Sequence, residues 1–308
     1  LVIVGKGMAW SRAEDEVRSF VERTQLPFLA SPMGKGVIDD NHPLSVGAAR
    51  SHALKEADVI FLMGARLNWI MHFGSKPRFK EGVKIIQLDI AHEAIGNNQP
   101  TEVPLVGDGK AITGQLNKAL ENRQWFYPAD TEWRGALKEK AEANAVQIQP
   151  MIDDNSSPTN YYRALKDIRE AMTEDTIIIG EGANTMDIGR TQLPNASPRL
   201  RLDAGSYGTM GIGMGFAIAA AVVNPDQPVV SVSGDSALGF SGMEIETACR
   251  HNLQIKIVVL NNGGIGRGVE ALPTDGQIPA HLLTVAARYD QMMEAFGGKG
   301  FYVEDPAD

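Results

Sequence analysis

Two short polar motifs, each placed directly after an apolar run, constrain this chain more than any other feature. Gly234-Asp235-Ser236 follows residues 229–233, Asn261-Asn262-Gly263-Gly264 follows residues 255–260, and 24 residues separate the two motifs. Residues 243–252 in that interval have a helical pattern, so the stretch predicts two parallel strands joined by a crossover helix. Such strands end at the same edge of a sheet, which is where open α/β sheets bind ligands.

Asp235 and Asn262 are therefore predicted to lie close together at that edge. Mg²⁺ takes oxygen ligands, typically a carboxylate or amide together with substrate phosphates and waters. The flanking glycines allow a diphosphate to approach the backbone. This layout resembles the thiamine-diphosphate-binding motif, in which GDG or GDS is followed by a crossover and then by a pair of asparagines. Either half alone is a common turn, whereas the pair at this spacing favours a metal–diphosphate site.

Length and composition limit the class of protein. The 308 residues suggest about two domains, and the net charge of −9 gives no general attraction to nucleic acid or to an anionic membrane. The single cysteine, Cys249, excludes an internal disulfide and fits a reducing compartment. The longest apolar stretch, residues 211–223, is too short to cross a bilayer. We therefore expect no nucleic-acid or membrane partner.

The order of patterns predicts an α/β protein with two doubly wound parallel-sheet domains. Residues 1–122 are predicted to form a Rossmann-like domain, 123–158 a linker with a helix, and 159–308 the metal–diphosphate domain. The predicted strands cover residues 1–4, 26–30, 58–63, 83–90, 176–179, 229–233, 255–260 and 301–303. Because residue 1 opens inside a strand and residue 308 follows another, we expect the sequence to be a fragment of a longer protein.

Other segments could belong to a functional site, but each also has a purely structural interpretation. The glycine-rich residues 205–215 suit either a close-packed helix start or a cofactor, and the turn at 181–185 suits either a helix cap or a phosphate. Arg190, Arg199 and Arg201 could pair with substrate phosphates or form surface ion pairs. Asp89 ends a predicted strand where doubly wound folds place a ribose-binding carboxylate, and Gly5-Lys6-Gly7 follows the first strand.

Over nearly its whole length the chain resembles oxalyl-CoA decarboxylase and 2-hydroxyacyl-CoA lyase. The motifs that carry this resemblance lie at residues 64–69 (GARLNW), 181–187 (EGANTMD), 234–247 (GDSALGFSGMEIET), 261–265 (NNGGI) and 295–300 (AFGGKG). The resemblance implies the central and diphosphate-binding domains of a three-domain enzyme. It also implies that the pyrimidine-binding domain, with the glutamate that activates the cofactor, and the end of the last domain lie outside this chain. We therefore assign no catalytic residue within it.

The resemblance further implies a role for individual residues. Asp235, Asn262 and the Gly264 carbonyl would bind Mg²⁺, the Gly208 carbonyl would accept a hydrogen bond from the aminopyrimidine, and Met210 would support the bent cofactor. The diphosphate would be surrounded by Ala183, Asn184, Gly234, Ser236 and Ala237. The coenzyme A phosphates would contact Arg190, with Asn144 as a weaker candidate, and ADP would bind at Lys6, Arg66 and Asp89 as a regulator.

The activity implied is cleavage of a 2-hydroxyacyl-CoA to formyl-CoA and an aldehyde or ketone. The alternative within the family is decarboxylation of oxalyl-CoA, and the alternative outside it is an inactive fragment that only binds nucleotide or cofactor. Family members usually carry Ile-Tyr where this chain has Ile265-Gly266, and an open pocket at Gly266 favours the bulkier 2-hydroxyacyl group. We expect an acyl-CoA substrate, a homodimer or homotetramer, and a cytoplasmic location, or a peroxisomal one if the source is eukaryotic.

Overall fold

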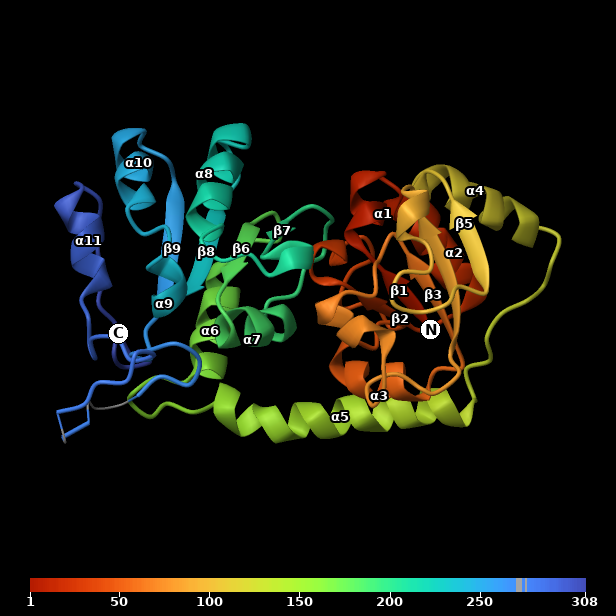
Figure 1. Cartoon of the computed structure of the whole chain (residues 1–308), viewed down its shortest axis with the longest axis horizontal. Coiled ribbons are helices and arrows are strands. Elements are labelled where there is room, and N and C mark those ends of the chain that lie inside the picture. The colour runs from red at the N-terminus through yellow and green to blue at the C-terminus, as the bar shows by residue number, and fades with distance from the viewer. Residues whose placement is uncertain (270–272, 275) are drawn as a thin grey trace. The chain divides into compact units, whose positions relative to one another are not determined.

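The computed structural model describes residues 1–269, 273–274 and 276–308 (Figure 1). The chain forms two compact units, which are described separately. Unit 1 consists of Leu1–Gln149 together with Pro194–Arg199, and unit 2 consists of Pro150–Leu193 together with Leu200–Asp308. Each unit is built on one parallel sheet with helices on its faces, as the sequence predicted.

Unit 1 contains a five-stranded sheet in the order β2-β1-β3-β4-β5, with every neighbouring pair parallel. The strands are β1 (Val2–Val4), β2 (Phe28–Ala30), β3 (Val59–Met63), β4 (Lys84–Asp89) and β5 (Val103–Val106). Ile3 and Leu62 point to one face of this sheet, and Val4 and Met63 point to the other. Both faces are apolar, as expected of a parallel sheet that is buried on both sides.

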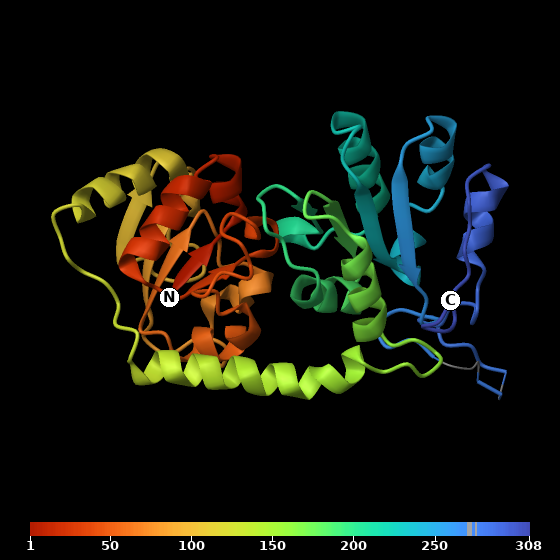
Figure 2. The same cartoon turned by 180° about the vertical axis from the view of Figure 1, so that it is seen from behind.

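Helices cover the two faces of the unit 1 sheet (Figures 1 and 2). One face packs against α1 (Lys6–Trp10), α2 (Glu14–Thr24) and α4 (Gly109–Leu120). The other face packs against α3 (Arg50–Glu56) and, through Leu137, against α5 (Glu132–Ile152). Short 3-10 turns occur at Pro32–Gly34, Gly47–Ala49, Trp69–Gly74 and His92–Ala94. The candidate residues of this unit lie at the carboxyl edge of the sheet: Asp89 ends β4, Lys6 begins α1 after β1, and Arg66 follows β3.

Unit 2 contains a four-stranded parallel sheet in the order β7-β6-β8-β9. The strands are β6 (Ile177–Glu181), β7 (Arg201–Leu202), β8 (Val229–Gly234) and β9 (Ile255–Leu260). Helix α8 (Gly213–Val223) packs on one face, and α6 (Tyr161–Ala171) and α7 (Asn184–Gln192) pack on the other. The remaining elements are a 3-10 turn at Gly205–Tyr207 and the helices α9 (Asp235–Leu238), α10 (Glu244–Arg250) and α11 (Tyr289–Ala295).

The predicted strands match the observed ones to within a few residues, with three differences. Residues 301–303 form no strand, and their side chains are 79%, 38% and 60% exposed. An apolar run becomes a strand only when a neighbouring strand supplies its hydrogen bonds, so that prediction was wrong. Strands β5 and β7 were not predicted, because β5 includes Pro104 and β7 is only two residues long. The predicted linker, residues 123–158, contains the whole of α5, and its boundaries stay a prediction.

An apolar cavity of about 900 Å³ lies in unit 1, at the amino ends of the strands. It is lined by residues that include Leu1, Val59 and Val103, at the starts of three strands, and Trp125 and Tyr127 from the segment after α4. The candidate residues of unit 1 are at the opposite edge of its sheet, so this cavity is separate from them. Among the described residues, no helix is long and apolar enough to span a membrane.

The burial pattern of unit 2 predicts which positions determine its stability. Ile179 in the centre of β6 is fully buried, whereas Val222 on α8 is 61% exposed. We expect Ile179→Ala to lower the free energy of unfolding by about 2–5 kcal/mol, because it leaves a cavity in the core. The control Val222→Ala should change it by less than about 0.5 kcal/mol. Urea denaturation followed by circular dichroism measures both, and equal effects would contradict the assignment of this core.

Candidate metal and diphosphate site

The two motifs meet at the carboxyl edge of the unit 2 sheet. Strands β8 and β9 pair in parallel with Gly234 opposite Leu260, so that Asp235 and Asn262 follow neighbouring strand ends. The backbone N–H of Gly264 donates to Asp235 Oδ2 at 3.0 Å and to Asn262 Oδ1 at 3.3 Å. The structure therefore brings together the three residues that the sequence proposed as metal ligands.

Asp235 carries a buried carboxylate that backbone N–H groups surround. Its side chain is 2% exposed, and burial raises its pKa, while hydrogen bonds from backbone N–H groups, including Ser236 at 2.8 Å, act in the opposite direction. A carboxylate in this position is stabilised when a cation binds it. Within the described residues no three His, Cys, Asp or Glu side chains gather. One carboxylate with an amide and a carbonyl oxygen suits Mg²⁺, which completes its shell with phosphates and water.

The carbonyl of Gly266 lies between two asparagines of the candidate site. It accepts hydrogen bonds from Asn262 Nδ2 at 2.9 Å and from Asn184 Nδ2 at 3.1 Å. The residue has a φ of +76°, and a Cβ built there would meet no atom within 4 Å. Gly266 is therefore beside the residues proposed for the metal and the diphosphate, in a left-handed conformation that favours glycine.

The turns that follow β6 and β8 lie against each other. A Cβ built on Gly182 would lie 3.4 Å from the nitrogen of Gly234 and 3.7 Å from the Cβ of Ala237. Ala183 is the N-cap of α7, which begins at Asn184, and Ser236 is in the short helix α9. The residues predicted to surround a diphosphate thus come from two adjacent turns, and the φ of +117° at Gly182 favours glycine there.

The glycine-rich segment follows β7 and leads into α8. Gly208 ends the 3-10 turn in a left-handed conformation, and Met210 is 38% exposed. Backbone N–H groups of Gly211, Ile212 and Gly213 donate to the carboxylate of Glu181 at the end of β6. The segment proposed to contact the thiamine rings is in this way joined to the strand that leads to the proposed diphosphate turn.

Sequence reasoning missed the partner of Asn262. The Tyr161 hydroxyl accepts a hydrogen bond from Asn262 Nδ2 at 3.0 Å, and burial, with a smaller effect from the charge of Asp235, raises the pKa of Tyr161. Tyr161 is the first residue of α6, 101 residues before Asn262 in the chain. A single tyrosine at a helix start has no sequence signal for such a contact. The contact of Glu181 did have a sequence signal, because an acidic side chain at the end of an apolar strand needs a hydrogen-bond partner.

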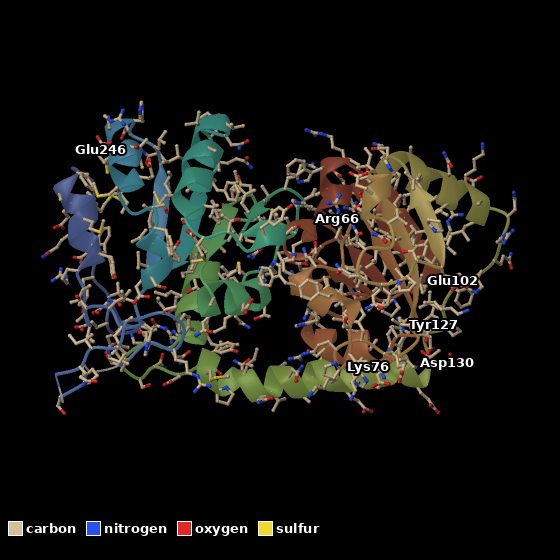
Figure 3. All side chains as sticks on the ribbon, in the orientation of Figure 1. Arg66, Lys76, Glu102, Tyr127, Asp130 and Glu246 are labelled. Carbon is tan, nitrogen blue, oxygen red and sulfur yellow. The ribbon has the colours of Figure 1, made fainter. Side chains whose placement is uncertain are left out.

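The candidate nucleotide residues of unit 1 lie at the carboxyl edge of its sheet. Asp89 ends β4 and is 6% exposed, and its two oxygens accept bonds from Arg66 at 3.0 and 3.2 Å. The backbone N–H of Ala91 donates to the same carboxylate at 2.9 Å. Arg66, marked in Figure 3, is 54% exposed in its side chain. Lys6 begins α1 after β1, which pairs with β3, the strand that precedes Arg66. The structure places all three at one edge and joins two of them.

The residues proposed for coenzyme A each have a partner within their own unit. Arg190 on α7 forms ion pairs with Asp187 at 2.9 Å and with the buried Asp203 at 3.3 Å. Asn144 on α5 donates to the carbonyl of Ala48 at 2.8 Å. The other two arginines considered as phosphate ligands are also engaged, Arg199 by Glu14 and Arg201 by the Leu193 carbonyl. Their roles in binding substrate stay predictions.

Comparison with known protein families identifies the family to which the chain belongs. Residues 1–116 match the family described as thiamine pyrophosphate enzyme, central domain, and residues 181–308 match thiamine pyrophosphate enzyme, C-terminal TPP binding domain. The chain belongs to the thiamine pyrophosphate enzymes. The cofactor of this family is thiamine diphosphate, and the matched binding domain contains both motifs at the edge of the unit 2 sheet.

The chain is similar to several curated proteins over its whole length or nearly so. It is 50% identical to "2-hydroxyacyl-CoA lyase 1" of Mus musculus, over 100% of this chain and 55% of that protein. It is 48% identical to the Homo sapiens protein of the same name, over 100% of this chain and 56% of that protein. It is 44% identical to "Oxalyl-CoA decarboxylase" of Escherichia coli K12, over 98% of this chain and 54% of that protein. The chain spans about half the length of these relatives.

We expect Asp235→Asn to weaken binding of thiamine diphosphate without lowering the stability of the ligand-free chain. Burial raises the pKa of Asp235, so its ionised form destabilises the ligand-free chain near neutral pH, and removing the charge should leave Tm unchanged or raise it by up to about 4 °C. This gain should vanish below the unfolded pKa of about 3.9, where the carboxyl is protonated in both states. Affinity for thiamine diphosphate with Mg²⁺ should fall by more than about 100-fold. Calorimetric titration and thermal melts across pH measure these effects.

Asp226→Asn provides the matched control, because Asp226 is exposed in the loop before β8. It should change neither Tm nor cofactor affinity. For the wild type, affinity for the cofactor with Mg²⁺ should fall as the pH is lowered, because protons compete for the Asp235 carboxylate. Cofactor affinity that Asp235→Asn leaves unchanged would rule out Asp235 as a metal ligand.

Proposed function

We propose that the protein is a thiamine-diphosphate-dependent carbon–carbon lyase that cleaves a 2-hydroxyacyl-CoA to formyl-CoA and an aldehyde or ketone. The observation that carries this proposal is the identity of 50% to the mouse 2-hydroxyacyl-CoA lyase 1 along the whole chain. The meeting of Asp235, Asn262 and Gly264 at the edge of the unit 2 sheet supports it, because this set of oxygen ligands suits a magnesium–diphosphate group.

The chain's own residues would hold and orient the cofactor. Asp235, Asn262 and the Gly264 carbonyl would bind Mg²⁺, and the turns at Gly182–Asn184 and Gly234–Ala237 would enclose the diphosphate. The Gly208 carbonyl would accept a hydrogen bond from the aminopyrimidine, and Met210 would support the ring system. Thiamine diphosphate supplies the electron sink for breaking the bond next to the thioester carbonyl, while the protein provides binding, orientation and exclusion of water.

The direct test is an assay of the full-length gene product with a 2-hydroxyacyl-CoA, Mg²⁺ and thiamine diphosphate. We expect equal amounts of formyl-CoA and aldehyde, dependent on both additions. The 308-residue chain alone should bind the cofactor and give no turnover, because the resemblance places the activating glutamate outside it. Absence of formyl-CoA from the full-length protein loaded with cofactor would contradict the proposal.

Oxalyl-CoA decarboxylase is the second candidate, because the Escherichia coli enzyme of that name is 44% identical along nearly the whole chain. Residue 266 offers a way to separate the two activities. Its position beside Asn184 and Asn262, with open space at the Cβ, supports a place for it near the reacting groups. Glycine there leaves room for a bulky acyl group, whereas a tyrosine adds both volume and a hydroxyl donor.

Gly266→Tyr in the full-length protein should shift selectivity toward the smaller substrate. We expect kcat/KM for a branched or long 2-hydroxyacyl-CoA to fall relative to oxalyl-CoA by about tenfold or more, since volume differences of a methylene are worth roughly 1–3 kcal/mol. Gly266→Ala is the control for backbone strain, because both variants place a Cβ at a φ of +76°. A ratio that is equal in the two variants would show that residue 266 does not face the acyl group.

We also propose that Lys6, Arg66 and Asp89 bind an adenine nucleotide in unit 1. Arg66 and Lys6 would supply positive charge for phosphates, and the carboxylate of Asp89 at the end of β4 would accept a hydrogen bond from a ribose hydroxyl. Millimolar ADP should raise the Tm of the chain with increasing concentration, and Arg66→Ala should reduce the rise. Arg78→Ala removes an exposed arginine of the same unit as a control. A folded wild type that shows no shift would contradict this site.

A further inference from the structure

The carboxylate of Glu181 is buried at the end of β6, where it is 1% exposed. It accepts hydrogen bonds from three consecutive backbone N–H groups at the start of α8: Gly211, Ile212 at 3.1 Å and Gly213 at 2.9 Å. Hydrogen bonds to an ionised acceptor are stronger than those to a neutral one, and the amino end of a helix favours negative charge. These contacts offset the cost of burying the carboxylate.

The start of α8 is shaped around this carboxylate. A Cβ built on Gly213 would lie 2.4 Å from Glu181 Oε2, so only glycine allows the backbone to approach so closely. Gly211 has a φ of +83°, which turns its N–H toward the same group. A helix N-cap needs one side chain that accepts from one or two N–H groups. Here the side chain of Glu181, which comes from β6, accepts hydrogen bonds from three N–H groups. It therefore joins two segments that are far apart in the chain.

The two joined segments are the two halves of the proposed cofactor site. Glu181 immediately precedes the turn of Gly182–Asn184 and pairs in register with Ser233, next to Gly234 and Asp235. On the other side, Gly211 follows Met210 directly and lies three residues after Gly208. One carboxylate thus ties the diphosphate and metal end of the site to the glycine-rich segment proposed to contact the thiamine rings.

We propose that Glu181 is a positioning residue that holds the 205–213 segment in the conformation that binds the thiamine rings. The proposal rests on the proposed function of this site as a thiamine diphosphate site. With glycines at 205, 208, 211 and 213, the segment has much conformational freedom to lose on binding. The Glu181 carboxylate removes this freedom before the cofactor arrives. Without the anchor, ring binding weakens while the diphosphate end of the site remains.

The test compares two ligands with the full-length gene product in the presence of Mg²⁺: thiamine diphosphate, which uses both ends of the site, and inorganic pyrophosphate, which uses only the metal end. Glu181→Gln keeps the size of the side chain but presents an amide N–H₂ to backbone donors. We expect it to weaken thiamine diphosphate binding by about tenfold or more and pyrophosphate binding by less than about twofold, by calorimetric titration. Hydrogen exchange at residues 205–213 should be faster in the ligand-free variant.

Three further variants test this interpretation. Gly213→Ala forces a methyl group against Glu181 Oε2 from the other side, and it should give the same pattern even if Glu181→Gln does not fold. Glu244→Gln changes an exposed carboxylate in the first turn of α10 and should behave as wild type. Asp235→Ala should lose both ligands, which distinguishes a damaged metal end from a displaced segment.

The outcomes separate this inference from the proposed function. Thiamine diphosphate affinity within about twofold of wild type in Glu181→Gln, or equal loss of both ligands, would overturn the positioning role. If the wild-type chain binds pyrophosphate but not thiamine diphosphate, the proposed cofactor function fails, and hydrogen exchange alone decides the anchor. Faster exchange at residues 205–213 then supports it, and unchanged exchange overturns it.

Discussion

The parallel pairing of β8 with β9 is the constraint on which the candidate site depends. Because parallel strands require a crossover, the chain must leave the sheet after Gly234, form α10, and return so that Leu260 ends opposite Gly234. The next residues of both strands then face the same edge. A buried carboxylate at that edge is unfavourable alone, and backbone N–H groups from Ser236 and Gly264 compensate for it only in part. The remaining imbalance is what a magnesium–diphosphate group would relieve.

Buried carboxylates lie at the carboxyl ends of β8, β6 and β4, and their hydrogen-bond donors differ. At Asp235 the backbone donors leave a carboxylate whose burial still raises its pKa, as expected for a side chain that binds a cation. At Glu181 three donors from one helix start surround the carboxylate, which suits a permanent structural contact. In unit 1, Asp89 is held by the guanidinium of Arg66. These three buried acids thus differ in the number and the kind of their hydrogen-bond donors.

The sequence was sufficient for the sheets and for the meeting of Asp235 with Asn262, because apolar runs and the length of a crossover are local properties. It was insufficient where a contact depends on segments far apart. Tyr161 meets Asn262 across 101 residues, and no pattern near Tyr161 indicates it. Residues 301–303 have the composition of a strand, but among the described residues no strand pairs with them. Strand β5 was missed for the opposite reason, since pairing with β4 overrides its poor strand composition.

The central claim is that the edge of the unit 2 sheet binds a divalent cation and a diphosphate through Asp235, Asn262 and Gly264. The most direct measurement is a crystal structure of the chain with thiamine diphosphate and Mn²⁺, a Mg²⁺ substitute that anomalous scattering locates. The account predicts an anomalous peak within about 2.5 Å of an Asp235 carboxylate oxygen, Asn262 Oδ1 and the Gly264 carbonyl oxygen, bridged to the diphosphate. A bound cofactor whose metal lies elsewhere, with Asp235 still held only by backbone N–H groups, would contradict it.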